Sequence, residues 1–117
     1  MNPLTSQFLP LSQATLHILL ALAGTDLHGY GIMREVKQQS DGQYRLGPGT
    51  LYENLQRLLD KGLVAETLPA SKDEDRRRRY YRLTTLGRQV LAAEISRLED
   101  MFREAKLKLL EAKTRRA

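Results

Sequence analysis

Leu46-Gly-Pro-Gly-Thr-Leu-Tyr-Glu-Asn-Leu-Gln-Arg-Leu-Leu-Asp-Lys-Gly-Leu63 is the stretch of sequence that decides the fold. Pro48 suits the first turn of a helix, where its missing N–H costs nothing, and Gly62 suits a helix end that requires a positive φ. Between these two residues, leucines repeat at the spacing of one buried helical face: Leu51, Leu55, Leu58 and Leu59. The stretch therefore predicts a single amphipathic helix with well-marked ends.

The outer face of this helix is polar and carries mixed charges and hydrogen-bonding groups: Thr50, Glu53, Asn54, Gln56, Arg57 and Asp60. Arginine pairs with guanine, and asparagine or glutamine pairs with adenine, in the major groove of DNA. An ordinary surface helix has the same kind of outer face. The helix alone therefore leaves two interpretations open, and the rest of the sequence has to distinguish them.

Composition restricts the class of protein. The chain has 117 residues, 41% of them hydrophobic, which is enough for one domain with a modest core but not for a large catalytic cleft. It contains no cysteine, which excludes disulfides and thiolate metal sites, and its net charge of +5 favours a polyanionic partner. It has neither an apolar run long enough to span a membrane nor a signal-peptide pattern. We therefore expect a cytoplasmic protein with no cofactor and no membrane partner.

The N-terminal part predicts an arm and a first helix. Residues 1–10 have no regular pattern and are expected to form an extended arm that docks through its apolar residues. Ser12 is a good N-cap for a helix over residues 13–23. The spacing of apolar residues predicts its buried stripe, with His17 and Ile18 outside it: Leu16, Leu19, Leu20 and Ala23.

A second helix is expected to have formed by Ile32. Gly29 and Gly31 precede it, an unfavourable choice for a helix that usually permits two backbones to approach closely. The residues expected to be buried are Ile32, Met33 and Val36. Residues 40–42 predict a turn, and residues 44–46 predict a short extended piece that leads into the opening stretch.

After Gly62 the pattern of apolar residues changes from helical spacing to alternation. Residues 63–68 and 78–84 predict the two strands of a β-hairpin, with Tyr81 and Leu83 on one face and Tyr80 and Arg82 on the other. The tip of the hairpin is rich in arginine, and we expect three arginines to contact phosphates while the neighbouring acids at 73–75 face away: Arg77, Arg78 and Arg79.

Thr84 is expected to cap a last helix that runs to about Lys113. Its apolar residues alternate in steps of three and four, the heptad spacing of a helix–helix contact: Leu91, Ile95, Leu98, Phe102, Ala105, Leu109 and Ala112. Such a helix is roughly 40 Å long at about 1.5 Å per residue, which exceeds the body of a small domain. The sequence therefore predicts a homodimer.

Three helices, a hairpin and a dimerisation helix follow one another in the order of a winged helix-turn-helix protein. Several motifs occur in that order: His28-Gly29-Tyr30-Gly31-Ile32; Gly49-Thr50-Leu51-Tyr52, followed by Leu55, Arg57, Leu58, Gly62 and Leu63; and Arg79-Tyr80-Tyr81 with Leu83, Thr84 and Gly87. Together they resemble the PadR family of bacterial transcriptional regulators over residues 11–90.

The resemblance implies a dimeric repressor whose ligand, where one exists, relieves DNA binding. The fold implied is α+β, mostly α: a winged helix-turn-helix over residues 1–84, N-terminal arm included, and a long dimerisation helix over residues 85–117, as in the short members of the family. The absence of tryptophan departs from short members that hold flat drugs between tryptophans. An enzyme is not expected.

The opening helix is then expected to enter the major groove of double-stranded DNA, at an operator with two-fold symmetry. Thr50 and Tyr52 lie near its N-terminus, where a phosphate is favoured, although Tyr52 fits a half-buried core position equally well. The residues expected to contact base edges are Asn54, Gln56 and Arg57.

Two alternatives concern function. The same fold could serve as a protein-interaction module that does not read DNA. A small hydrophobic effector could also bind at the dimer centre, between the first and last helices, among Leu16, Ile95, Leu98, Met101 and Phe102.

His28 and Tyr30 are expected to have structural roles. The spacing of His28 from other candidate ligands does not match a metal site, so we expect it to pack at the start of the second helix. Tyr30 is expected to be a core and cap residue.

Overall fold

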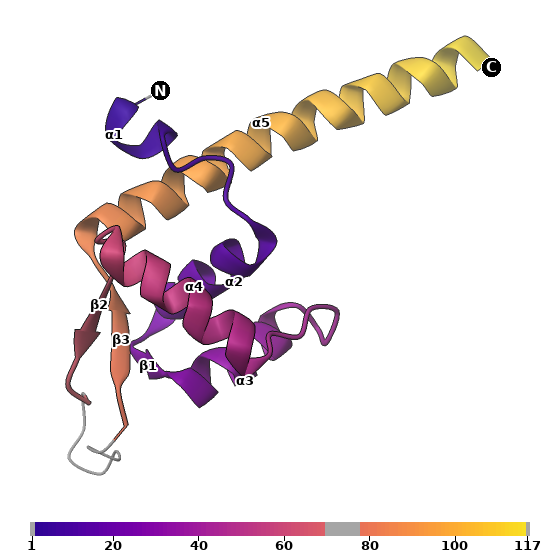
Figure 1. The fold of residues 1–117 in the computed structure, drawn as a ribbon. Coiled ribbons are helices and arrows are strands. Elements are labelled where there is room, and N and C mark those ends of the chain that lie inside the picture. Colours follow the sequence, from indigo (N-terminus) through magenta and orange to yellow (C-terminus); the bar gives the residue numbers. More distant parts are fainter. Residues whose placement is uncertain (1, 70–77, 117) are drawn as a thin grey trace.

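The computed structural model describes residues 2–69 and 78–116, which form five helices and a small antiparallel sheet (Figure 1). In chain order these are α1 (Pro3–Ser6), α2 (Gln13–Gly24), β1 (Leu27–His28), α3 (Gly29–Gln39), α4 (Pro48–Asp60), β2 (Val64–Thr67), β3 (Tyr80–Leu83) and α5 (Thr85–Arg116). The predicted mostly α, α+β architecture with a long last helix is confirmed.

Helix α2 is the centre of the fold and contacts α3, α4, α5 and β3. Ser12 caps it as predicted by accepting a hydrogen bond from the Thr15 amide (3.1 Å). The predicted buried stripe was wrong in part, because Ile18 is fully buried whereas Leu20 is 41% exposed. The helix is apolar on nearly all sides, so the spacing of its apolar residues could not select the inward face.

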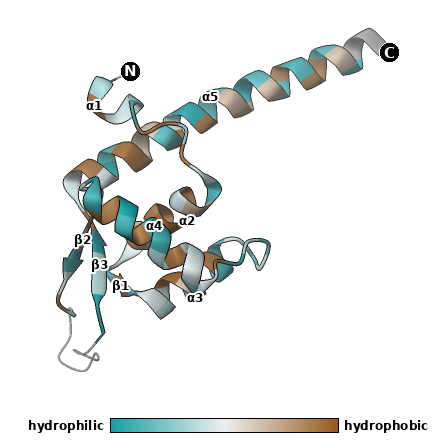
Figure 2. Cartoon of the chain, viewed as in Figure 1, coloured by the Kyte–Doolittle hydropathy of each residue, from teal (hydrophilic) through white to brown (hydrophobic). Residues whose placement is uncertain are grey.

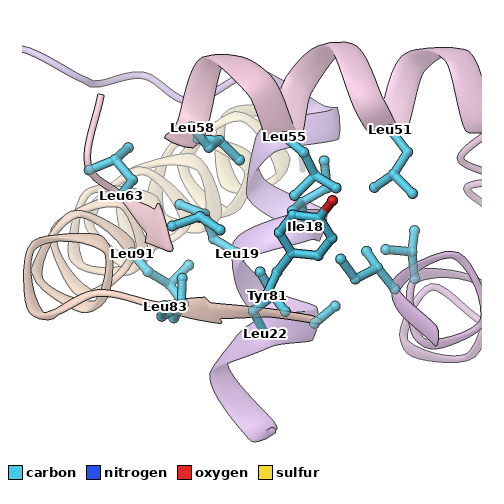
Figure 3. Packing of buried hydrophobic residues seen from close by; sticks show 14 of the residues in the cluster. Ile18, Leu19, Leu22, Leu51, Leu55, Leu58, Leu63, Tyr81, Leu83 and Leu91 are labelled. Carbon is cyan, nitrogen blue, oxygen red and sulfur yellow. The ribbon is translucent and has the colours of Figure 1, made fainter. Parts of the chain in front are cut away.

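The core lies between α2, α3, α4, β2, β3 and the start of α5 (Figure 3), and Ile32 and Val36 of α3 are fully buried in it as predicted. From α4, Leu51, Leu55 and Leu58 point at α2, as the leucine spacing predicted, and Leu59 packs at the edge of the core. Gly62 has φ 75°, so it ends α4 in the left-handed conformation expected of it. The positions of the α4 side chains are therefore fixed by burial of one leucine face.

The sheet has three strands in the order β1-β3-β2, all antiparallel. The predicted hairpin is β2 and β3, with Val64 opposite Leu83 and Thr67 opposite Tyr80. The third strand, β1, was not predicted, since two residues are too short to show alternation. Residues 44–46, predicted as an extended piece, belong to no strand and lead directly into α4.

The N-terminal residues are not an extended arm, contrary to prediction. Asn2 caps the short helix α1 by accepting a hydrogen bond from the Leu4 amide (2.9 Å), and Pro3 occupies its first turn. Helix α1 packs beside α5 (Figure 1). The connection to α2 is fixed by Glu94 of α5, whose carboxylate accepts from the Leu11 amide (2.7 Å).

Glu94 is 1% exposed and also pairs with Arg97 at 2.5 Å. The hydrogen bond from Arg97 lowers the pKa of Glu94, burial raises it, and the Leu11 amide lowers it again; the net shift is downward. The buried carboxylate is therefore charged at neutral pH and holds the N-terminal segment against α5.

The join between the sheet and α5 is tight. Thr84 caps α5 by accepting from the Gly87 amide (3.0 Å) and donates its hydroxyl hydrogen to the Gly62 carbonyl (2.6 Å). Gly87 lies directly against the Leu63 carbonyl, and a side chain at residue 87 would collide with that backbone atom. This is a close approach of two backbones that glycine alone permits.

Beyond Gly87, α5 continues as one unbroken helix and projects from the body of the protein (Figure 1). With this helix included, the molecule measures 62 × 34 × 24 Å. Its first turns supply Val90 and Leu91 to the core, while the projecting part carries hydrophobic residues interspersed with polar ones (Figure 2). None of the helices in the described part of the chain is long and apolar enough to span a membrane.

Candidate nucleic-acid interface

The outward face of α4 begins at an uncapped helix N-terminus. Gly47 occupies the N-cap position without a side chain to accept a hydrogen bond, and Gly49 and Thr50 in the first turn are exposed. The first amide groups of a helix have no partner within the helix and carry a partial positive charge. This end of α4 therefore favours an anion such as a phosphate.

The polar residues that follow on α4 differ in how strongly the chain holds them. Gln56 donates to Asp60 (3.0 Å), and Arg57 pairs with Glu53 (2.5 Å), with side chains 60% and 65% exposed. Exposed pairs of this kind contribute little free energy, so both side chains can exchange their partner for another.

Asn54 is held more firmly, because both ends of its amide are used inside the chain. Its oxygen accepts from the Thr15 hydroxyl of α2 (3.2 Å), and its nitrogen donates to the Thr50 carbonyl (2.7 Å). The side chain is half-buried. Asn54 thus ties α4 to α2, and among the three predicted base-contacting residues it is the one with a clear structural role.

Tyr52 is half-exposed, and its hydroxyl lies directly against Gly29. A Cβ on residue 29 would collide with the tyrosine oxygen and ring. The glycine in this position therefore makes room for a side chain, not for a second backbone as the sequence suggested. The half-buried position expected for Tyr52 is confirmed, because one side of its ring is packed and half of its surface faces solvent. Its contact with a phosphate stays a prediction.

His28 has the structural role that the sequence predicted. It is the N-cap of α3, and its Nδ1 accepts a hydrogen bond from the Gly31 amide (3.0 Å). Its ring packs edge-on against Tyr80, with ring centroids 5.3 Å apart, which buries Tyr80 although it lies on the same strand face as the exposed Arg82.

Tyr30 is neither a core residue nor a cap, contrary to prediction, because it is 59% exposed. Its ring stacks nearly parallel to that of His28, with centroids 6.4 Å apart, and the Arg34 guanidinium lies 5.9 Å from the centroid of the Tyr30 ring. The sequence indicated that His28, Tyr30 and Arg34 lie at the start of a helix, but it could not show that their side chains lie next to one another on the surface. The sequence analysis therefore did not include them in the candidate site.

Two of the three predicted hairpin arginines, Arg78 and Arg79, lie immediately before β3 and near His28 and Tyr30. Arg78 Nη1 is 3.0 Å from His28 Nε2, and Arg79 makes an exposed 3.7 Å ion pair with Glu66 of β2. Arg77 and the acids at 73–75 lie outside the described residues. Hence the basic part of the hairpin that is described adjoins the start of α3.

A hollow of about 410 Å³ joins these elements, and it is lined by His28, Gly29, Tyr30, Tyr52, Arg78, Arg79 and Tyr81. Burial raises the pKa of Tyr81 and nearby Glu66 raises it further, so its hydroxyl stays neutral. Of the predicted residues, the hollow brings together Tyr52 of α4 and Arg78 and Arg79 of the hairpin, which are far apart in the sequence. Asn54 and Arg57 line a different hollow, beside the start of α2.

The predicted dimer residues divide into two groups. Leu91 lies in the core of its own chain, whereas Ile95, Phe102 and Leu109 are 40%, 63% and 72% exposed. Leu98 is half-buried and Ala105 is exposed. We name the set that remains accessible the seam: Ile95, Leu98, Phe102, Ala105 and Leu109.

Of the predicted ligand residues, Leu16 is half-buried against the core from α2, and Met101 is half-exposed on α5. Among residues 2–69 and 78–116, no group of three or more His, Asp or Glu side chains is placed to hold a metal ion.

Comparison with known proteins identifies the family. The sequence profile of the Transcriptional regulator PadR-like family matches residues 18–93. Transcriptional regulator Rv3488 of Mycobacterium tuberculosis is 37% identical over 89 residues, which cover 76% of this chain and 78% of that protein. An uncharacterised protein of Lysinibacillus sphaericus is 31% identical over 93 residues, covering 74% and 84% of the two chains.

Solved structures of PadR proteins have the same fold as this chain. A PadR family transcription regulator of Clostridium difficile has a TM-score of 0.64 at 26% identity, covering 85% of this chain and 98% of that one. Bacillus subtilis PadR, solved in complex with operator DNA, has a TM-score of 0.61 at 23% identity over 74% of this chain and 48% of that one, which shows a shared fold. The expectation that the chain is not an enzyme is confirmed by this relationship, since the relatives are regulators. The chain belongs to the PadR-like family of transcriptional regulators.

Proposed function

We propose that this chain is a sequence-specific DNA-binding repressor that acts in the cytoplasm as a homodimer on an operator with two-fold symmetry. One observation carries the proposal: Tyr52 of α4 lines the same hollow as Arg78 and Arg79 of the hairpin. Bacillus subtilis PadR, which has the same fold, is seen on operator DNA. A protein-interaction module would not require an uncapped helix N-terminus and arginines on the same face.

In the proposed complex, α4 enters the major groove with its outward face. Thr50 and the free amides of the first turn contact phosphate, and Gln56 and Arg57 exchange their weak surface partners for base edges. Asn54 contributes by fixing α4 on α2. The hairpin arginines at 77–79 contact phosphates beside the groove.

The projecting part of α5 supplies the second half of the proposal. The seam includes three large apolar side chains that are exposed in the single chain: Ile95, Phe102 and Leu109. Fully burying a side chain of this size contributes about 1.5–3 kcal/mol, which favours pairing with a second copy. The pair presents two α4 helices to successive major grooves, about 34–36 Å apart. A small hydrophobic effector that relieves repression would bind near Leu16 and Met101, at the centre of the dimer.

DNA binding is tested by fluorescence anisotropy with a duplex from the promoter region of the protein's own gene and a random duplex, at two salt concentrations. The wild type is expected to prefer the promoter duplex. The variant R78A/R79A is expected to bind both duplexes more weakly, with a salt dependence flatter by about 0.9 units of log–log slope per lost phosphate contact. R103A is the matched control, since Arg103 is an exposed arginine on the projecting part of α5.

No preference of the wild type for the promoter duplex would refute the proposed function. A changed base preference with an unchanged salt slope in R78A/R79A would refute the phosphate role of the hairpin. In a promoter–reporter assay, the wild type is expected to lower transcription and R78A/R79A to restore it, and an increase caused by the wild type would contradict repression.

Dimerisation is tested by sedimentation of F102E. A charge in the seam is expected to give monomers and to weaken operator binding, because the two half-sites are then bound independently. Leu107 is 52% exposed and lies on another face of α5, so L107E is the matched control and is expected to remain dimeric. A dimeric F102E would contradict the seam.

A further inference from the structure

A second hollow, which we name the α2–α4 pocket, lies between α4 and the connection that leads into α2. Lys61 lines this pocket, whereas Tyr52 lines the hollow beside the hairpin. The two residues are separated by about two and a half helical turns, so the two hollows lie on opposite flanks of α4. The volume of the pocket is about 210 Å³, roughly that of seven water molecules. It therefore has room for a small molecule.

One wall of the α2–α4 pocket is apolar. Phe8 and Leu11 of the connection are half-buried, and Leu58 of α4 and Leu63 are almost fully buried. The connection is held in place from α5, because the Glu94 carboxylate accepts a hydrogen bond from the Leu11 amide (2.7 Å). The apolar wall is therefore preformed and favours a ligand with an apolar body.

The neutral polar side chains of the pocket bond to one another. The Ser12 hydroxyl donates to the Thr15 hydroxyl (3.0 Å), which donates to the side-chain oxygen of Asn54 (3.2 Å). The side-chain nitrogen of Asn54 donates to the Thr50 carbonyl (2.7 Å). The hydroxyl hydrogens are therefore already used within the chain, which leaves the charged side chains as the main donors for a ligand.

Two cations complete the pocket. Lys61 follows Arg57 by four residues, so the two side chains lie on the same side of α4. Within residues 2–69 and 78–116, the Lys61 side chain makes neither a hydrogen bond nor an ion pair. Arg57 pairs with Glu53 at the surface, where both side chains are more than half exposed, and such a pair is easily exchanged. Among the described residues that line the pocket there is no carboxylate, so the pocket favours an anion.

We propose that the α2–α4 pocket binds a small organic anion, a carboxylate on a compact apolar body. Lys61 and Arg57 donate to the carboxylate, and the apolar body packs against Phe8 and Leu11. A phosphate of DNA would use the two cations but not the apolar wall, which is why a carboxylate with a hydrocarbon body fits the pocket better. This site is separate from the effector site proposed at the centre of the dimer.

The proposed site has a consequence for regulation, which rests on the proposed function. Arg57 is proposed to contact a base edge, and it cannot hold a carboxylate in the pocket at the same time. The anion therefore competes with the operator for Arg57 and weakens DNA binding. Binding of the anion itself depends only on contacts within one chain, so it is measured without DNA.

Anion binding is tested by NMR titration of the ¹⁵N-labelled protein with cyclohexanecarboxylate. The expected Kd is on the order of 1 mM, within the range for a ligand of about nine non-hydrogen atoms. Amide shifts are expected at Leu11, Ser12 and Lys61. The neutral cyclohexanecarboxamide and inorganic phosphate are expected to bind at least about ten-fold more weakly, since the first lacks the charge and the second lacks the apolar body.

The decisive variant is K61Q, which removes the charge of an exposed side chain that the fold does not use. It is expected to raise the Kd for cyclohexanecarboxylate about ten-fold, the effect of one lost hydrogen bond between charged groups. K108Q is the matched control, because Lys108 is 72% exposed on α5 and does not line the pocket. It is expected to bind like the wild type.

Several results would overturn the proposed site: no binding of cyclohexanecarboxylate, equal binding of its amide, an unchanged Kd in K61Q, or shifts confined to the surroundings of Leu16 and Met101. If the wild type does not bind the carboxylate and K61Q instead weakens duplex binding with a flatter salt slope, Lys61 is a phosphate contact and the proposal is wrong.

Competition is tested by anisotropy with the promoter duplex at constant ionic strength. About 10 mM cyclohexanecarboxylate, ten times the expected Kd, leaves about one chain in eleven free and is expected to raise the apparent Kd for DNA about ten-fold. For K61Q the expected rise is about two-fold. An unchanged affinity for DNA in the presence of bound carboxylate would overturn the competition at Arg57. A wild type without preference for the promoter duplex would refute the proposed function and leave the NMR result standing.

Discussion

Substitution of Gly87 by alanine tests the tightest backbone contact in the fold. The new Cβ would collide with the Leu63 carbonyl oxygen and lie 3.3 Å from Leu83 Cδ2. A backbone atom cannot rotate away as a side chain can, so α5 has to move away from the start of β2. The same Leu63 carbonyl accepts a hydrogen bond from the Thr84 amide (3.1 Å), which such a movement strains.

The expected loss of stability follows from these contacts. Overpacking costs about 1–3 kcal/mol, a broken backbone hydrogen bond costs about 1 kcal/mol, and the higher helix propensity of alanine offsets up to about 1 kcal/mol. We therefore expect G87A to lower the free energy of unfolding by about 1–3 kcal/mol. At about 4 °C per kcal/mol, the Tm falls by roughly 4–12 °C.

The assay is urea and thermal unfolding followed by circular dichroism, at one protein concentration because dimerisation shifts the midpoint. G24A is the matched control: Gly24 ends α2 with nothing within 4 Å of a Cβ. It is expected to unfold within about 1 kcal/mol of the wild type, on the stabilising side. Equal midpoints for G87A and G24A would refute the collision and the tight join between the sheet and α5.

Two further predictions concern polar side chains. Because the pKa of Glu94 is lowered in the folded state, its stabilising contribution is complete above its ordinary value of 4.5 and is lost as the pH falls through the folded pKa. Unfolding measured between about pH 3 and pH 7 should therefore show a smaller acid loss of stability for E94Q than for the wild type, and equal losses would contradict this. N54A is expected to lose about 1 kcal/mol of stability through its bonds to Thr15 and Thr50, with unchanged base preference. Binding to operators with single base changes checks this, and an altered preference at full stability would contradict it.

The elements that depend on local sequence were predictable. Helix α4 was placed nearly to the residue, because Pro48 and Gly62 act on their own backbone and the leucines show a clear period. The cap of α5 at Thr84 was found for the same reason. The family motifs added the order of the elements and hence the winged helix-turn-helix.

What depends on distant neighbours was not predictable. Strand β1 exists because β3 offers it an edge, and its two residues carry no pattern of their own. The inward face of α2 is selected by the elements around it, since nearly every side of that helix is apolar. His28 meets Arg78 across 50 positions of sequence, so this contact on the surface follows from the sheet and not from the HGYG motif.

Because α5 is one continuous helix, it couples the seam rigidly to the DNA-binding part of the chain. Near its N-terminus it is packed tightly against the sheet at Gly87, and the seam is centred near Phe102, about 22 Å away at about 1.5 Å per residue. If two copies cross at the seam, a change of roughly 10° in the crossing angle moves the two α4 helices by roughly 4 Å relative to each other over that length. The spacing of the two α4 helices is then adjusted from the middle of the dimer, with every side chain on the DNA-facing surface left as it is.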